Sequence, residues 1–151
     1  MEDHAKELAG TFAGVSTDDE ATARTAAFDY LEQEFGADAA EVVRAMSNPL
    51  KAEGLTREES NSGYVGHELD EIVKPRVFLS KFADFGDNAL SLHHSQNPSM
   101  AKELATKYLP LVEPFRARLE QPDLAALVGA AGLAAMRTHL EGNRLTEFAT
   151  A

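Results

Sequence analysis

Residues 75–94, PRVFLSKFADFGDNALSLHH, decide the fold expected for this chain. Apolar side chains occupy nearly all faces that this stretch would have as a helix, and a helix that is apolar all round is buried. Lys74-Pro75 marks its start, because proline fits the first turn of a helix. The stretch therefore predicts a central helix that the rest of the chain surrounds.

Three polar residues in this stretch, Lys81, Asp84 and Asn88, are spaced three and then four positions apart. On a helix this spacing places them in one line. A buried carboxylate is costly unless it is paired or binds a metal, so Asp84 needs a partner. Two interpretations are open. Asp84 is either paired with Lys81 or otherwise satisfied in the core, or it belongs to a ligand or metal site in the helix wall.

Local polar motifs mark further helix starts. Thr17-x-x-Glu20 and Thr56-x-x-Glu59 have the spacing of a capping box, in which two side chains satisfy free backbone N–H groups at a helix start. Asp123 precedes the apolar pattern of the last helix and is a suitable N-cap residue. We expect helices to begin near these three positions.

The remaining pattern is helical throughout. No stretch alternates convincingly with period two, and no repeat or linker divides the chain. Pro110 and Pro114 predict a kink or a restart, Gly142 predicts the end of the last helix, and the tail after it is expected to be frayed. At 151 residues, we expect a single helical domain over residues 1–151, an all-α bundle of six to eight helices.

Composition and charge argue against several function classes. The net charge is −11, from 25 acidic and 14 basic residues, and without a basic run no nucleic-acid partner is expected. No apolar run reaches the length of a membrane span, and the N-terminus lacks the basic and apolar regions of a signal peptide, so no membrane partner is expected. The absence of cysteine removes thiolate metal sites and fits a cytoplasmic protein.

KFADFGDN, residues 81–88, resembles the K-x-A-D-x-x-D/H-N segment of HD-domain metal-dependent phosphohydrolases. The similar branch contains the RelA/SpoT-type hydrolases of guanosine tetraphosphate and pentaphosphate. Two further segments resemble that family in the expected order, LEQEFGADAAEVVRAMSNP at residues 31–49 and AKELATKYLPLVEPFRARL at residues 101–119. The resemblance extends over residues 1–122 and implies an HD-domain-like helical bundle, which agrees with the helical pattern.

The resemblance also implies a reaction and a site. The substrate would be a small phosphorylated nucleotide such as guanosine tetraphosphate. The cofactor would be a divalent metal, manganese or similar, which generates hydroxide and polarises the phosphate. The implied residues are Glu2 and Asp3 as a catalytic pair that positions water, Lys81, Asn88 and Tyr108 as substrate-binding residues, and Asp84 as a metal ligand.

Two departures from the family pattern bear on this function. The family holds its metal with a histidine, an adjacent His-Asp pair and a later aspartate, but this sequence contains no His-Asp dipeptide. We therefore expect the chain to correspond to the C-terminal two-thirds of an HD domain, and whether it is active as a hydrolase as it stands is left open. Phe85-Gly86 replaces the Arg-Leu of the stringent-response enzymes, which removes support for pentaphosphate specificity.

Three hypotheses remain open at this point. The chain is a metal-dependent phosphohydrolase, or it is a non-catalytic helical module, or it is a plain helical domain with a chance likeness around Asp84. The non-catalytic module would bind a nucleotide or a partner, or would form a homo-oligomer through apolar surface that missing helices would have covered.

Overall fold

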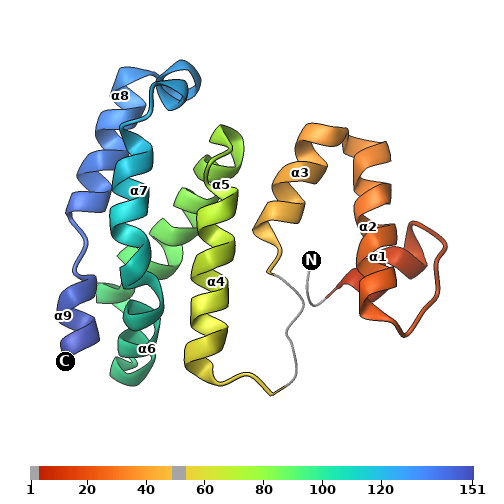
Figure 1. The fold of residues 1–151 in the computed structure, drawn as a ribbon, viewed down its shortest axis with the longest axis horizontal. Coiled ribbons are helices and arrows are strands. Elements are labelled where there is room, and N and C mark those ends of the chain that lie inside the picture. The colour runs from red at the N-terminus through yellow and green to blue at the C-terminus, as the bar shows by residue number, and fades with distance from the viewer. Residues whose placement is uncertain (1–3, 49–53) are drawn as a thin grey trace. The chain divides into compact units, whose positions relative to one another are not determined.

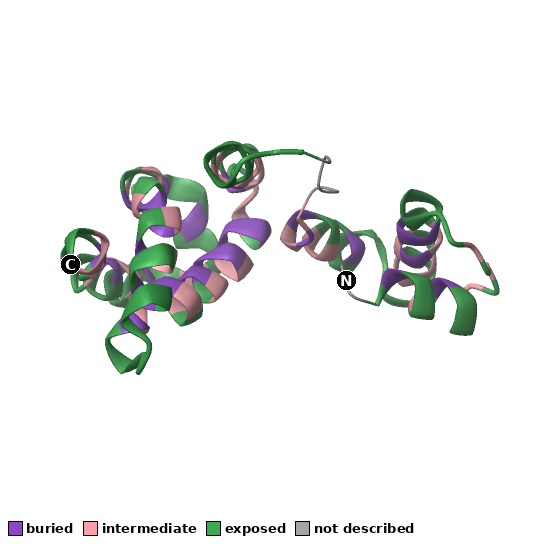
Figure 2. Cartoon of the chain, turned by 90° about the horizontal axis from the view of Figure 1, so that it is seen from below, coloured by how far each residue is buried: buried purple, intermediate pink, exposed green. Residues whose placement is uncertain are grey.

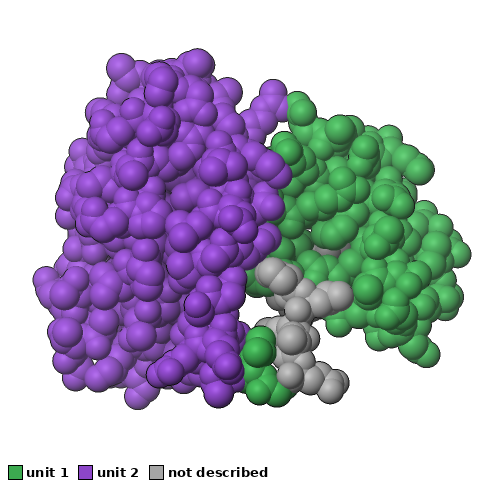
Figure 3. All heavy atoms as spheres, viewed as in Figure 1, with its two compact units in different colours: residues 1–55 green, residues 56–151 purple. Residues whose placement is uncertain are grey.

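The structure, a computed structural model, describes residues 4–48 and 54–151. Every element in these two ranges is helical, and seven of their α-helices are eight residues or longer (Figure 1). The prediction of an all-α fold with six to eight helices is confirmed. Contacts divide the chain into two compact units, residues 1–55 and residues 56–151 (Figure 3). A single domain over residues 1–151 stays a prediction, and each unit is described by itself.

Unit 1 contains three helices around a small core. They are α1 (Ala5–Thr11), α2 (Glu20–Phe35) and α3 (Ala37–Met46). The buried cluster of this unit consists of Ala5, Ala9 and Ala23, with Val15 and Ala26 packed beside them. Alanine side chains remove little apolar area from water, so this core stabilises the unit weakly.

The start of α2 differs from the prediction. Asp19, and not Thr17, is the N-cap residue, and its carboxylate accepts a hydrogen bond from the backbone N–H of Thr22 at 2.8 Å. The hydroxyl of Thr17 instead accepts a hydrogen bond from the backbone N–H of Asp19 at 3.1 Å. The predicted capping box at Thr17 is therefore wrong, because a stronger capping residue follows two positions later.

Unit 2 is built from longer helices joined by short turns. The capping box at Thr56 and Glu59 is present, and Pro75 and Pro98 occupy first-turn positions, as the sequence predicts. The elements are α4 (Arg57–Glu71), α5 (Pro75–Phe85), the π-helix η1 (Gly86–Leu90), the 3₁₀-helices η2 (Leu92–His94) and η3 (Leu109–Leu111), α6 (Pro98–Tyr108), α7 (Val112–Leu119), α8 (Pro122–Glu141) and α9 (Leu145–Thr150).

Aromatic side chains form the centre of unit 2. Phe85 and Phe115 have ring centroids 4.9 Å apart, and Phe78 contacts Phe115 at 5.5 Å. All three phenylalanines are almost completely buried. In Figure 2 the buried residues of unit 2 lie on the helix faces that are turned toward its interior. The prediction that residues 75–94 supply the centre of the fold therefore holds for α5.

The central stretch is not one continuous α-helix. The α-helix ends at Phe85, and the chain continues as the π-helix η1 and the 3₁₀-helix η2. The wider turn begins at Gly86, and glycine is the poorest helix former after proline. π-Helical turns are rare, and they frequently occur at functional sites. Asn88 lies in η1 and contacts Asp84 of α5.

Two predictions about the C-terminal segment are wrong. Asp123 is not an N-cap residue, because α8 begins at Pro122 after Gln121 and the Asp123 carboxylate instead accepts hydrogen bonds from Arg118. The residues after Gly142 are not frayed, because they form α9, which lies against α6 (Figure 1). Leu145 of α9 is completely buried. Both errors concern contacts with another helix, Arg118 of α7 in the first case and α6 in the second, which the pattern within one helix does not report.

The longest described helix is α8, with 20 residues. Gly129 interrupts it with φ 69° and ψ 170°, a backbone conformation that is reserved almost entirely for glycine. None of the described helices is both long enough and apolar enough to cross a membrane.

Candidate functional site

Seven polar side chains from four elements of unit 2 lie together. Hydrogen bonds, ring contacts and electrostatic interactions connect them. Four of them are the residues that the resemblance predicts for the substrate and the metal. We call this group the Asp84 cluster; it comprises Tyr64 and Glu68 from α4, Lys81 and Asp84 from α5, Asn88 from η1, and Lys107 and Tyr108 from α6.

Lys81 forms a buried ion pair with Glu68. Its Nζ donates to Oε1 of Glu68 at 2.5 Å, and the two side chains are only 3% and 4% exposed. The interpretation that Lys81 pairs with Asp84 is therefore wrong, because the partner of Lys81 is Glu68. Burial raises the pKa of Glu68, while the hydrogen bond and the charge of Lys81 oppose that rise. The pair joins α4 to α5 one turn before Asp84, and contact of Lys81 with a substrate stays a prediction.

Asp84 is half-buried at the end of α5. Its Oδ1 accepts a hydrogen bond from Nδ2 of Asn88 at 2.8 Å. Burial raises the pKa of Asp84, and the positive charges of Lys81 and Lys107 oppose that rise. Asp84 and Asn88 therefore act as one polar unit at the junction of α5 and η1.

Tyr64 and Tyr108 form the aromatic wall of the cluster. Their ring centroids are 5.9 Å apart with the rings nearly perpendicular, and Tyr108 also contacts Phe85 at 5.9 Å. Burial raises the pKa of both phenols, and the negative charge of Asp84 adds to this effect. Both phenols consequently remain neutral at physiological pH and able to donate hydrogen bonds.

The cationic part of the cluster is the ammonium group of Lys107. Its Nζ lies 3.8 Å from the centroid of the Tyr64 ring and 5.0 Å from that of Tyr108. The side chain is partly exposed, in contrast to Lys81. At 3.8 Å, an ammonium group is well inside the range of a cation–π interaction.

The described residues do not fit a divalent metal on their own. A metal site in a protein usually needs several side-chain ligands. Across residues 4–48 and 54–151, no three histidine, aspartate or glutamate side chains are grouped to hold a metal ion. Asp84 is a single carboxylate, and Glu68 is bound to Lys81. The predicted catalytic residues Glu2 and Asp3 lie outside the described residues.

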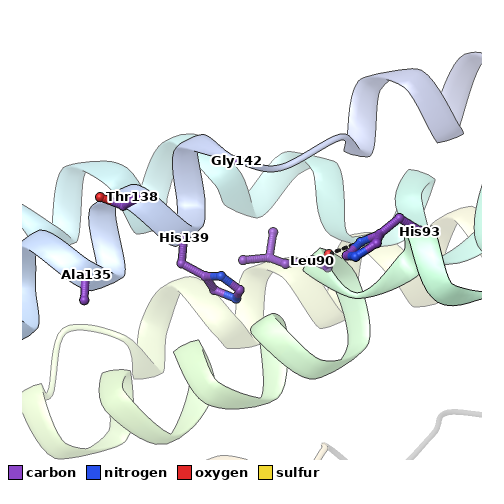
Figure 4. Close-up of a pocket in the computed structure, with 6 residues that line it drawn as sticks. All are labelled: Leu90, His93, Ala135, Thr138, His139 and Gly142. Atoms are coloured by element: carbon purple, nitrogen blue, oxygen red, sulfur yellow. Dashed lines mark hydrogen bonds between the residues drawn. The ribbon is translucent and has the colours of Figure 1, made fainter.

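A second polar region lies between the π-helical segment and α8. An open pocket of about 480 Å³ is lined by Leu90, His93, Ala135, Thr138, His139 and Gly142 (Figure 4). A ring nitrogen of His93, Nδ1, lies 3.1 Å from the carbonyl oxygen of Leu90. Both histidines of this pocket, His93 and His139, are exposed.

Sequence reasoning missed three members of the Asp84 cluster. Tyr64 and Glu68 are four positions apart on α4, a spacing that places them on one helix face. Lys107 directly precedes the predicted Tyr108. These signals were present in the sequence, but only the packing of α4 and α6 against α5 identifies their partners.

Comparison of the chain with protein-family models, curated proteins and solved structures gives no match. Membership of the HD-domain family therefore stays an expectation from the residues quoted above. The function proposed below rests on that resemblance and on the Asp84 cluster.

Proposed function

We propose that the Asp84 cluster binds a small phosphorylated nucleotide such as guanosine tetraphosphate. The observation that supports this most strongly is the convergence of the predicted residues. Asp84, Asn88 and Tyr108 come from α5, η1 and α6, and they lie in one cluster although the resemblance was noted from sequence alone. If the resemblance to the family were due to chance, there would be no reason for Asn88 and Tyr108, which are 20 positions apart in the sequence, to lie in the same cluster.

The chemistry of the cluster suits such a ligand. Asn88 carries an amide that both donates and accepts hydrogen bonds, as recognition of a base or sugar requires. The neutral phenol of Tyr108 adds a hydrogen-bond donor beside the aromatic faces of both tyrosines. Lys107 supplies the positive charge that a phosphate needs in a chain of net charge −11.

Metal-dependent hydrolysis is the second candidate, because the resemblance implies Asp84 as a metal ligand. Its Oδ1 is bound to Asn88, and among the described residues no hydrogen bond to its Oδ2 is present. A divalent metal such as manganese, if bound, would supply an activated water and neutralise phosphate charge. Because no described group of three ligands surrounds Asp84, we assign binding to this chain and derive no hydrolytic step from it.

Isothermal titration calorimetry tests the proposal. Guanosine tetraphosphate is titrated into the full chain, with and without manganese, and release of phosphate is followed in the same samples. We expect saturable binding that Tyr108→Phe weakens by about fivefold, since one lost hydrogen bond is worth about 1 kcal/mol.

The matched control is Tyr30→Phe, because Tyr30 lies in unit 1 and stacks on Phe12 with ring centroids 5.6 Å apart. Tyr30→Phe is expected to bind as the unchanged chain does. No binding heat with the nucleotide, with or without manganese, would contradict the proposed function. Stoichiometric release of phosphate would make metal-dependent hydrolysis the first candidate function.

A further inference from the structure

We infer that Lys107, and not Lys81, is the cation that binds the phosphates of the ligand, and that Tyr64 positions its ammonium group. This inference rests on the proposed function and names the residue that makes the site select phosphorylated ligands. It reverses the assignment that the resemblance alone suggests, in which Lys81 binds the substrate.

Lys81 is poorly placed to recognise a phosphate. Its side chain is 3% exposed and its Nζ is bound to Glu68 at 2.5 Å. Contact with a phosphate would require this buried pair to separate and leave the carboxylate of Glu68 unpaired inside the protein. The ion pair is neutral as a unit, so it contributes little net charge to the site.

Lys107 has the access and the position that Lys81 lacks. It is partly exposed in the last turn of α6, and its Nζ lies 3.8 Å from the Tyr64 ring centroid. Its charge also acts on Asp84, since it lowers the pKa of that carboxyl group against the effect of burial. Lys107 therefore also offsets part of the negative charge that Asp84 would present to an anion bound there.

Tyr64 fixes where the ammonium group lies. The face of an aromatic ring attracts a cation, so the Tyr64 ring holds Nζ over itself and toward Tyr108, whose ring centroid is 5.0 Å away. A lysine side chain otherwise has many rotamers, and holding it in one of them reduces the entropy lost on binding. Tyr64 is thus a positioning residue that acts through Lys107.

The test is a titration series with ligands that differ only in phosphate number. Guanosine, guanosine diphosphate and guanosine tetraphosphate are titrated into the full chain and into Lys107→Met. In the unchanged chain we expect affinity to rise with phosphate number. In Lys107→Met we expect tetraphosphate affinity to fall at least tenfold, with little change for guanosine and a weaker dependence of affinity on salt concentration.

Three further variants complete the experiment. Lys102→Met removes an exposed lysine from the same helix and is expected to leave the series unchanged. Glu68→Leu/Lys81→Met replaces the buried pair by apolar side chains and is also expected to retain tetraphosphate affinity. Tyr64→Leu is expected to weaken tetraphosphate binding, and Tyr64→Phe, which keeps the ring face, is expected to restore it.

The outcomes separate this inference from the proposed function. Absence of binding in the unchanged chain would overturn both. Binding in the unchanged chain with an equal affinity in Lys107→Met would overturn the inference and leave the proposed function standing. A folded Glu68→Leu/Lys81→Met protein, checked by circular dichroism, that loses tetraphosphate affinity would return the phosphate-binding role to Lys81.

Discussion

The side chains of Lys81 and Glu68 illustrate how a buried ion pair contributes to this fold. Each is less than 5% exposed, and each satisfies a charge that would otherwise be buried alone. The attraction between such partners is largely offset by their loss of hydration, so the pair adds little net stability compared with apolar residues. Removal of one partner is different, because it leaves the other charge in the core.

Lys81→Met is therefore expected to reduce the free energy of unfolding by about 3–5 kcal/mol, because Glu68 would remain buried without its partner. The double variant Glu68→Leu/Lys81→Met is expected to recover most of that loss. Urea unfolding followed by circular dichroism measures both variants. A single variant as stable as the unchanged chain would show that Glu68 reaches solvent.

Arg118 provides a contact whose strength depends on pH. Its guanidinium donates to the backbone carbonyls of Ile72 and Val73 and to both carboxylate oxygens of Asp123. These bonds connect the end of α4 to the start of α8. The hydrogen bonds from Arg118 hold the pKa of Asp123 below its ordinary value of 3.8.

Because the folded-state pKa of Asp123 is depressed, its contribution to stability is present above about pH 4 and is lost as pH falls through the folded-state value. Asp123→Asn is expected to lower the melting temperature at pH 7, and the difference from the unchanged chain is expected to shrink below pH 4. Thermal unfolding from pH 7 to pH 2.5 measures this, with the exposed Asp70→Asn as control. A difference that is constant over this range would contradict the assignment.

At the scale of single elements, the π-helix η1 is the feature that distinguishes this chain from a regular bundle. Its first residue, Gly86, has helical backbone angles, φ −58° and ψ −45°. A Cβ atom there would meet only the exposed His139 side chain, at 3.4 Å, which is an ordinary contact. The surroundings of Gly86 therefore leave room for a Cβ atom.

Gly86→Ala is expected to stabilise the protein by up to about 1 kcal/mol, because alanine is the better helix former and the site has room for its methyl group. Gly129→Ala is the matched comparison. Gly129 has φ 69° inside α8, and alanine there is expected to cost about 1–3 kcal/mol. Thermal unfolding of both variants measures the two effects. Destabilisation by Gly86→Ala would indicate that η1 requires glycine.

Whether each prediction from the sequence was confirmed depends on the contacts that compete with the local signal. Several signals that act within one turn were predicted correctly, such as the capping box at Thr56 and the prolines at the starts of α5 and α6, whereas the capping box at Thr17 was not. Where another side chain or helix competes with a local signal, the prediction was wrong. Asp123 is a good N-cap residue by type, but Arg118 occupies its carboxylate.

In the candidate site, too, some residues could be predicted from the sequence and others depend on packing between helices. The line of Lys81, Asp84 and Asn88 could be predicted from helical spacing, whereas Tyr108 was predicted only from the family resemblance. The partner of Lys81 could not be predicted from either, because Glu68 reaches it across an interface between two helices. An ion pair between helices is decided by packing, and many residues in an acidic chain could have filled that role.

At the scale of the whole molecule, the two compact units differ in the size of their cores. Unit 2 contains an aromatic and aliphatic cluster that includes Phe78, Phe85, Phe115 and Leu140. The cluster of unit 1 consists of alanines with one valine beside them. Since apolar area removed from water is the main source of stability, unit 2 has most of the folding free energy.

Residues 56–151 are therefore expected to fold when expressed alone, with a cooperative thermal transition and helical circular dichroism. All members of the Asp84 cluster lie in this segment, so it is also expected to bind guanosine tetraphosphate as the full chain does. Residues 1–55 alone are expected to lack a cooperative transition, because a core of this size is marginal. An unfolded 56–151 segment would instead favour the single domain expected from the sequence.

The central claim, that the Asp84 cluster binds a phosphorylated nucleotide, is tested most directly by nuclear magnetic resonance. Amide resonances of the full ¹⁵N-labelled chain are followed during titration with guanosine tetraphosphate. We predict saturable shifts concentrated at Tyr64, Asn88, Lys107 and Tyr108. Shifts confined to the pocket of His93 and His139, or no shifts at millimolar nucleotide, would contradict the claim.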